Sequence, residues 1–183
     1  MIIMKISIVE YAHLLLRSQL TKDDVVVDAT AGRGLDTLFL AEITKHVYAF
    51  DIQAEAISST QALLTNNKID NVTLVKDSHE NIPKYVSDFK GVVFNLGYLP
   101  HGDKTITTLA DSTLKTVKAL IELLTESKFI LIVVYPNHPN GLTESVALDQ
   151  YFETLDPSHF NILKVALPYQ TNKPPYLFFI TKK

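Results

Sequence analysis

The segment Val25-Val-Val-Asp-Ala-Thr-Ala-Gly-Arg-Gly34 predicts a buried strand that runs into a tight, glycine-containing turn. A helical stretch from Leu35 to Ile43 follows directly. Glycines at the carboxyl end of a central strand let a ligand approach the backbone closely. We therefore expect an α/β protein with a ligand site at the carboxyl end of this strand.

Beyond this segment, short apolar runs alternate with longer amphipathic stretches, which is typical of a parallel sheet wrapped by helices. Further strands are expected at residues 47–50, 72–75, 91–94, 129–134, 160–167 and 176–181. Further helices are expected at residues 7–20, 55–66, 79–86, 107–124 and 143–155. No repeat or linker interrupts this order, so we expect one domain over residues 1–183, with the helix within residues 1–20 covering the ligand pocket.

The last two strands are expected to pair antiparallel. Their connector, Pro168 to Pro175, carries three prolines. It is too short for the crossover that parallel strands require. A seven-stranded, mostly parallel sheet with an antiparallel C-terminal hairpin and helices on both faces is the Rossmann-like arrangement of class I methyltransferases. Ordinary dinucleotide-binding domains lack that hairpin.

The composition limits the possible functions. Of the 183 residues, 46% are hydrophobic and 20% are charged, which allows a sizeable core. The absence of cysteine excludes disulfides, Fe–S clusters, thiolate zinc and a cysteine nucleophile. The longest apolar run, 129–134, is far shorter than the roughly 20 residues of a membrane span. We expect a cytoplasmic protein without membrane contact, and its net charge of −3 gives no general attraction to nucleic acid.

The glycine loop differs from the dinucleotide-binding fingerprint. That fingerprint, G-x-G-x-x-G, requires a third glycine where this chain has Thr37, so an NAD site is not expected. The spacing acidic-x-x-x-Gly-x-Gly, with Thr30 at the first glycine position, is closer to the acidic-x-Gly-x-Gly-x-Gly motif that binds S-adenosylmethionine. This cofactor carries an ammonium and a sulfonium instead of a pyrophosphate, and Asp28 beside the loop suits its positive charge.

Acidic residues close three successive strands. Asp51 is placed to accept hydrogen bonds from ribose hydroxyls, and Asp77 to bind an adenine amino group. Three such acids indicate a cofactor site more strongly than any one of them, although Asp is also common in turns and caps. The expected cofactor-binding residues are Asp28, Thr30, Ala31, Gly32, Gly34, Asp36, Thr37, Asp51, Ile52, Gln53, Asp77, Ser78, His79 and Asn95.

The segment Asn95-Leu-Gly-Tyr98 ends the fourth strand, where amino-directed methyltransferases carry Asn/Asp-Pro-Pro-Tyr. An amide oxygen can accept hydrogen bonds from an amine and aim its lone pair, while a tyrosine ring can stack on a base. A primary alkylamine with a pKa of ~10.4 is protonated at neutral pH, so the site must lower that pKa or remove a proton. The expected catalytic residues are Asn95, Tyr98, Asp103 and His138, with His138 as base or orienter. Further candidates for the base are His79, His101 and Asp103.

Four motifs together resemble the YtqB-like rRNA methylase family. They are Asp-Ala-Thr-Ala-Gly-x-Gly-x-Asp-Thr (28–37), Asp-Ser-His-Glu (77–80), Asn-Leu-Gly-Tyr-Leu-Pro-x-Gly-Asp-Lys (95–104) and Tyr-Pro-x-His-x-x-Gly-x-x-Glu (135–144). Members of this family are understood as MnmM-type tRNA methyltransferases. The resemblance implies S-adenosylmethionine-dependent methylation of the 5-aminomethyl group of wobble 2-thiouridine, giving 5-methylaminomethyl-2-thiouridine. It also implies the tRNA anticodon stem-loop as partner and a direct transfer that requires no metal.

The chain departs from the usual family pattern at a few loop positions. His101 and Asn137 stand where glycine is usual, and Arg33 and Leu35 replace an asparagine and a histidine. None of these changes removes an expected chemical group. The candidate RNA contacts are the scattered basic residues Arg17, Arg33, Lys104, Lys115, Lys118 and Lys173. A chain of this length leaves little room for a separate RNA-binding part, so recognition should use the sheet-edge loops or a homodimer.

Three alternatives stay open on the residues alone. The acceptor could be rRNA, another tRNA position or a small amine. The fold could instead serve an NAD-dependent or nucleotide-binding protein, which the missing third glycine and the Asn95 segment disfavour. A non-catalytic S-adenosylmethionine sensor would keep the acids at the strand ends but would not need a polar segment such as Asn95-Leu-Gly-Tyr98.

Overall fold

A computed structural model describes residues 7–97 and 108–183 of the chain. The strands are β1 (Val25–Asp28), β2 (His46–Phe50), β3 (Val72–Val75), β4 (Gly91–Asn95), β5 (Phe129–Val134), β6 (Phe160–Val165) and β7 (Tyr176–Lys182). The helices are α1 (Ile8–Gln19), α2 (Leu35–Ile43), α3 (Ala54–Asn66), the 3-10 turn η1 (His79–Asn81), α4 (Ile82–Tyr85), α5 (Ala110–Leu123) and α6 (Pro139–Glu153). Every strand expected from the sequence is present.

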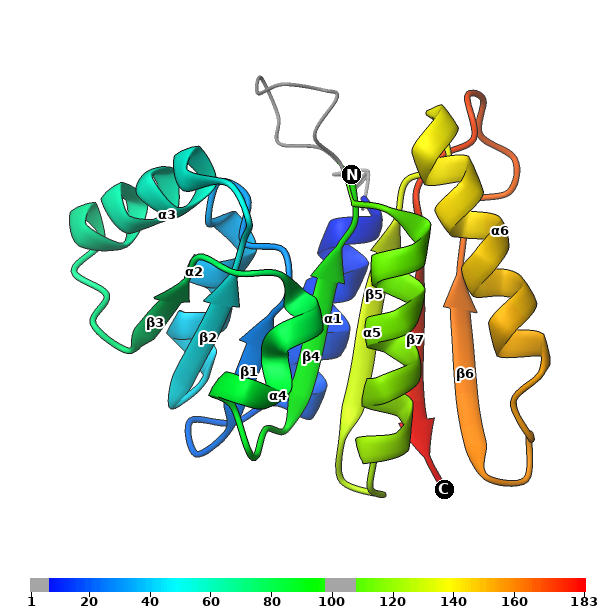
Figure 1. The fold of residues 1–183 in the computed structure, drawn as a ribbon, viewed down its shortest axis with the longest axis horizontal. Coiled ribbons are helices and arrows are strands. Elements are labelled where there is room, and N and C mark those ends of the chain that lie inside the picture. The colour runs from blue at the N-terminus through cyan, green and yellow to red at the C-terminus, as the bar shows by residue number, and fades with distance from the viewer. Residues whose placement is uncertain (1–6, 98–107) are drawn as a thin grey trace, which may run out of the picture.

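The strands form one seven-stranded sheet in the order β3-β2-β1-β4-β5-β7-β6. The pairs from β3 to β5 are parallel, while β7 lies antiparallel between β5 and β6 (Figure 1). This topology confirms the expected fold, including the antiparallel C-terminal hairpin. Strand β6 precedes β7 in the sequence but lies at the edge of the sheet. Strand β7 lies between β5 and β6, which run in the same direction.

Helices cover both faces of the sheet, because the central strands are apolar on both sides. Along β5, alternate side chains belong to different cores: Leu131 packs with α1 and α2, whereas Ile132 packs with α4, α5 and α6. All six residues of β5 are buried. Such a continuous apolar run is typical of a parallel strand that is covered on both faces.

Helix starts follow recognisable capping chemistry. At α1, the Ser7 hydroxyl accepts from the Glu10 backbone N–H while the Glu10 carboxylate accepts from the Ser7 N–H, which forms a capping box. The sequence-based start of α6 at Thr143 is wrong, because the helix begins at Pro139. Proline suits the first helical position, since its missing N–H would have had no helical partner there. The helix expected from residue 107 begins, within the described chain, at Ala110.

The topology determines where a site can form. From β1 the chain builds outward through β2 and β3 and then returns to add β4 on the other side of β1. Helices α2 and α5 therefore leave β1 and β4 in opposite directions and open a crevice at the carboxyl ends of these strands. Across residues 7–97 and 108–183, no helix has the length and apolar character needed to span a membrane.

A close backbone approach at the start of β4 generates the first prediction. Gly91 pairs with Phe129 on β5, and a Cβ atom at position 91 would collide with the Phe129 ring. Gly91→Ala should therefore lower the free energy of unfolding by about 1–3 kcal/mol through overpacking, as measured by urea denaturation. Adding Phe129→Leu should recover part of this loss. A Gly91→Ala protein as stable as the wild type would contradict the packing.

Candidate functional site

A cavity of about 610 Å³ lies at the carboxyl ends of the parallel strands. Of the residues expected to bind a cofactor or act in catalysis, its wall includes Thr30, Ala31, Gly32, Asp36, Asp51, Ile52, Gln53, Asp77, Ser78, His79, Asn95 and His138. These residues come from five separate loops, which the parallel sheet brings to one edge. Tyr98, His101 and Asp103 lie outside the described residues.

Asp28 lies beneath the glycine loop and is absent from the cavity wall, as are Gly34 and Thr37. Its carboxylate accepts a hydrogen bond of 2.6 Å from the Thr37 hydroxyl and one of 3.1 Å from the Thr30 N–H. Burial raises the pKa of Asp28 to about 7, and the nearby charge of Asp36 adds to this shift. Asp28 thus holds the loop against helix α2.

Gly34 explains why the loop needs glycine at its end. Its φ of 83° is in the left-handed region, and a Cβ there would meet the Thr60 side chain at 2.8 Å. The Thr60 hydroxyl donates to the Gly32 carbonyl at 3.2 Å, which ties the loop to α3. The loop is therefore held from below by Asp28 and from the side by Thr60, and its upper surface faces the cavity.

Asp51 joins the end of β2 to the glycine loop. Its carboxylate accepts from the Gly32 N–H at 3.0 Å and from the Gln53 N–H at 2.9 Å. Burial raises the pKa of Asp51, while these backbone donors oppose the shift. The carboxylate keeps further lone pairs for hydroxyl donors, as a ribose-binding acid requires.

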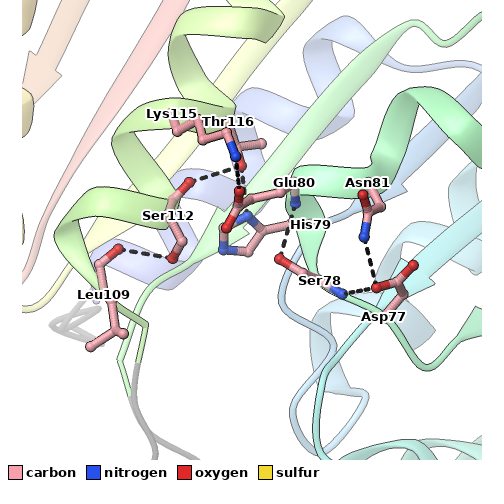
Figure 2. Close-up of polar contacts among 9 residues, drawn as sticks. All are labelled: Asp77, Ser78, His79, Glu80, Asn81, Leu109, Ser112, Lys115 and Thr116. Carbon is pink, nitrogen blue, oxygen red and sulfur yellow. Dashed lines mark hydrogen bonds and ion pairs between the residues drawn. The ribbon is translucent and has the colours of Figure 1, made fainter.

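Asp77, just after β3, is held by hydrogen bonds from neighbouring residues, and Figure 2 shows those from Ser78 and Asn81. It accepts from the Ser78 N–H at 2.7 Å, the Asn81 amide at 2.9 Å and the Tyr85 hydroxyl at 2.9 Å. These hydrogen bonds lower the pKa of Asp77. The bond from Asn81 has the largest effect, followed by those from Tyr85 and Ser78. The side chain therefore stays ionised and presents an acceptor to the cavity.

His79 connects η1 to α5, as Figure 2 shows. Its Nδ1 lies 2.8 Å from the Thr116 hydroxyl, which itself donates to the Ser112 carbonyl at 2.9 Å. Because that hydroxyl has a single proton, His79 must donate from Nδ1, and in the neutral ring Nε2 is then an acceptor. Burial lowers the pKa of His79, which favours this neutral form.

Asn95 lies at the centre of a polar network. Its backbone N–H donates to the Thr30 hydroxyl at 2.7 Å, and its side-chain Nδ2 donates to Asp36 Oδ2 at 2.7 Å. The other Asp36 oxygen lies 2.7 Å from Nε2 of His13 on α1. Helix α1 therefore contributes a side chain next to the cavity wall. Tyr135 completes the group: burial and the charge of Asp36 raise the pKa of its hydroxyl, and a hydrogen bond with Asn95 opposes that shift.

His138 is the N-cap of α6. Its Nδ1 accepts a hydrogen bond from the Gly141 N–H at 3.1 Å. A backbone N–H can only donate, so Nδ1 must be unprotonated, and a neutral His138 carries its proton on Nε2. Gly141 is required here, because a Cβ at this position would clash with the Tyr135 carbonyl and the His138 ring. Of the two roles expected for His138, this geometry favours the orienter over the base.

The buried carboxylate of Glu144 connects Gly97, just after β4, with residues at the start of α5. The Gly97 N–H donates to the Thr108 hydroxyl at 3.1 Å, and that hydroxyl donates to Glu144 at 3.0 Å. Thr113 donates to the other Glu144 oxygen at 2.6 Å. Burial raises the pKa of Glu144, and the two threonine hydroxyls oppose that shift. This chain of hydrogen bonds joins β4, α5 and α6 beside the cavity.

Several of these residues were not among the expected site residues. They are His13, Thr108, Tyr135 and Glu144. Tyr135 and Glu144 belong to the Tyr-Pro-x-His-x-x-Gly-x-x-Glu motif, and Tyr135 follows β5 at the same sheet edge as Asn95, so a signal for them existed. The pairing of His13 with Asp36 has no local sequence signal, because it depends on how α1 packs.

The fold and the site together define a class I methyltransferase that uses S-adenosylmethionine. The carboxylates of Asp36, Asp51 and Asp77 on the wall suit a cationic adenosine cofactor, and the cavity has room for a ligand of that size. The sequence model of the family described as "Putative rRNA methylase" matches residues 47–181. The chain belongs to this family, which confirms the resemblance seen in its motifs.

Known proteins agree with this assignment. An Arabidopsis thaliana protein named "tRNA (mnm(5)s(2)U34)-methyltransferase, chloroplastic" is 35% identical over 191 residues, which cover 95% of this chain and 69% of that protein. The solved structure of an rRNA methylase homologue from Clostridium thermocellum has a TM-score of 0.92 and 36% identity, covering 97% of this chain and 98% of that one. A Streptococcus mutans methyltransferase homologue solved in complex with SAH has a TM-score of 0.90 and 36% identity, covering 98% and 100%.

The buried Asp28 generates a prediction about pH. Because its pKa rises from 3.8 to about 7 on folding, the folded protein retains a proton that the unfolded chain loses within this range. The contribution of Asp28 to stability is therefore full below the unfolded pKa and decreases as pH rises through the folded pKa. Urea unfolding between about pH 5 and pH 8 should show the wild type losing stability relative to Asp28→Asn. A stability difference that does not change with pH would contradict the raised pKa.

Proposed function

We propose that this methyltransferase acts on tRNA and methylates the nitrogen of the 5-aminomethyl group of wobble 2-thiouridine, giving 5-methylaminomethyl-2-thiouridine. The observation that carries the proposal is the Asn95 side chain on the cavity wall, held by Asp36 at the position where an acceptor amine would enter. The name of the Arabidopsis relative, which covers 95% of this chain, supports the same acceptor.

For the cofactor, we propose that Asp51 binds the ribose hydroxyls and that Asp77 and Ser78 bind the adenine edge. The loop from Thr30 to Gly32 and the nearby Asp36 would lie against the amino-acid tail. Ile52 is 58% exposed and lines the cavity, so it offers an apolar surface to the adenine ring. Bound S-adenosylmethionine supplies an electrophilic methyl group on a sulfonium.

For the acceptor, the proposed step is a direct displacement. The amine lone pair forms the new N–C bond while the S–C bond breaks, and S-adenosylhomocysteine leaves. The Asn95 amide oxygen accepts a hydrogen bond from an N–H group of the amine, which directs the nitrogen lone pair at the methyl group. His138, with Nδ1 engaged by Gly141, serves as an orienter. The candidates that would remove a proton from the incoming ammonium are His79, His101 and Asp103.

For the RNA, we propose that the anticodon stem-loop binds across the sheet-edge loops. Leu35 and Leu109 line the cavity and are 69% and 57% exposed, which provides apolar contacts for unstacked bases. Arg33 also lines the cavity and is placed to approach a phosphate. We further propose that the protein works in the cytoplasm and is organised as one domain, with α1 reaching the site through His13.

The cofactor assignment predicts selective binding. By calorimetry, the protein should bind S-adenosylmethionine and not NAD. Asp51→Ala should weaken binding by at least about tenfold, because hydrogen bonds to the ribose are lost. Asp70→Ala is a matched control, since this exposed carboxylate precedes β3 at the opposite end of the sheet. Tight NAD binding, or unchanged affinity in Asp51→Ala, would overturn the assignment.

The acceptor assignment predicts a specific product. Purified protein incubated with labelled S-adenosylmethionine, and with tRNA from a strain that lacks the homologous activity, should convert 5-aminomethyl-2-thiouridine to its N-methyl form. Mass spectrometry of the nucleosides measures the conversion. Asn95→Ala should keep cofactor binding and lose turnover. Unchanged aminomethyl-thiouridine with the wild type would exclude this acceptor, and undiminished turnover in Asn95→Ala would exclude the role of Asn95.

A further inference from the structure

The Asp36 carboxylate lies between α1 and the end of β4 and contacts both. Oδ2 accepts from Asn95 Nδ2 at 2.7 Å, and Oδ1 lies 2.7 Å from His13 Nε2. The Asp36 side chain retains 17% of its exposure and that of His13 retains 28%, so both are partly shielded from water. Asp36 also acts on its surroundings as a charge, since it raises the pKa of the buried Asp28.

An ionised carboxylate has only acceptors, and this decides how the Asn95 amide is turned. The NH₂ group must face Asp36, because the opposite orientation would place the amide oxygen against a carboxylate oxygen. The backbone of Asn95 is already fixed, since its N–H donates to Thr30. The remaining freedom is the rotation of the amide, and the charge-assisted hydrogen bond to Asp36 removes it. The amide oxygen is then turned away from Asp36. Its two lone pairs leave room for a bond from an amine even where the amide also bonds to Tyr135.

His13 holds Asp36 from the other side. Its ring stacks on Phe39 with centroids 3.8 Å apart and an interplanar angle of 3°, so the imidazole cannot rotate freely. Arg17, one turn further along α1, lies 4.8 Å from the centre of the same Phe39 ring. With both of its oxygens engaged, Asp36 is held in a single orientation. Helix α1 thereby acts on Asn95 through Asp36.

We propose that Asp36 and His13 are positioning residues, which together orient the Asn95 amide so that its oxygen receives the acceptor amine. The inference rests on the proposed nitrogen methylation. It assigns Asp36 a role in addition to the cofactor contact expected from its place in the loop. It also gives α1 a part in methyl transfer, beyond covering the pocket.

Asp36→Asn tests the orientation, because an amide at position 36 can pair with either face of the Asn95 amide. At saturating S-adenosylmethionine, kcat should fall by at least about tenfold. Weaker binding of the cofactor cannot cause this loss, because the cofactor is saturating, and calorimetry measures its Kd separately. If the main effect were weaker cofactor binding with kcat unchanged, Asp36 would be a cofactor ligand and the proposal would be wrong. An unchanged kcat would also overturn it.

His13 allows a matched pair of variants. In His13→Gln, the side-chain amide can still donate to Asp36 from nearly the place of Nε2, whereas His13→Leu fills similar space without a donor. We expect His13→Leu to lower kcat about three- to tenfold with cofactor affinity kept, and His13→Gln to restore most of that loss. Equal kcat in the two variants would remove His13 from the proposed role.

A spectroscopic measurement needs neither RNA nor turnover. In protein with ¹⁵N-labelled asparagine, the Asn95 side-chain amide can be assigned by its loss in Asn95→Asp. One of its two protons should resonate well downfield of the other because it bonds to a carboxylate, and the separation should collapse in Asp36→Asn. Two ordinary amide protons in the wild type would overturn the inference even if tRNA is methylated. Conversely, a shifted proton in a protein that leaves tRNA unmodified would point to failure of the proposed acceptor alone.

Discussion

The site depends on the buried carboxyl group of Asp28. It receives the Thr30 N–H and the Thr37 hydroxyl, and each of these bonds leads on to Asn95. The Thr30 hydroxyl accepts from the Asn95 backbone, and Asp36, next to Thr37, accepts from the Asn95 side chain. One group beneath the glycine loop therefore fixes both the loop that faces the cofactor and the residue proposed to face the acceptor.

This arrangement has an electrostatic cost. Asp28, Asp36 and Asp51 lie close together, and burial together with the charge of Asp36 raises the pKa of Asp28. Concentrated negative charge at the carboxyl ends of the strands destabilises the empty site and favours a cationic ligand. A positively charged cofactor would relieve the repulsion among these acids.

Two tertiary connections frame the acceptor side of the cavity. On one side, α1 brings His13 to Asp36, and on the other, Glu144 joins Gly97, Thr108 and Thr113 across three elements. Both connections use buried or partly buried carboxylates that accept from donors on different elements. Such groups are costly to leave unpaired, so they hold the elements in a single arrangement.

Much of this protein was determined by its sequence alone. The glycine loop, the acids after β1, β2 and β3, and the short proline-containing connector before β7 established the fold and the position of the cofactor site, because each depends on neighbours within a few residues. Packing alone decided that His13 reaches Asp36, that Asn95 bonds to Thr30 and Asp36, and that Glu144 receives the Thr113 hydroxyl. Those contacts join segments that are distant in the chain, and no local pattern encodes a distance between them. The loop from Asp28 to Gly34 shows both sides: its sequence identified a ligand turn, and only the folded structure showed what holds that turn in place.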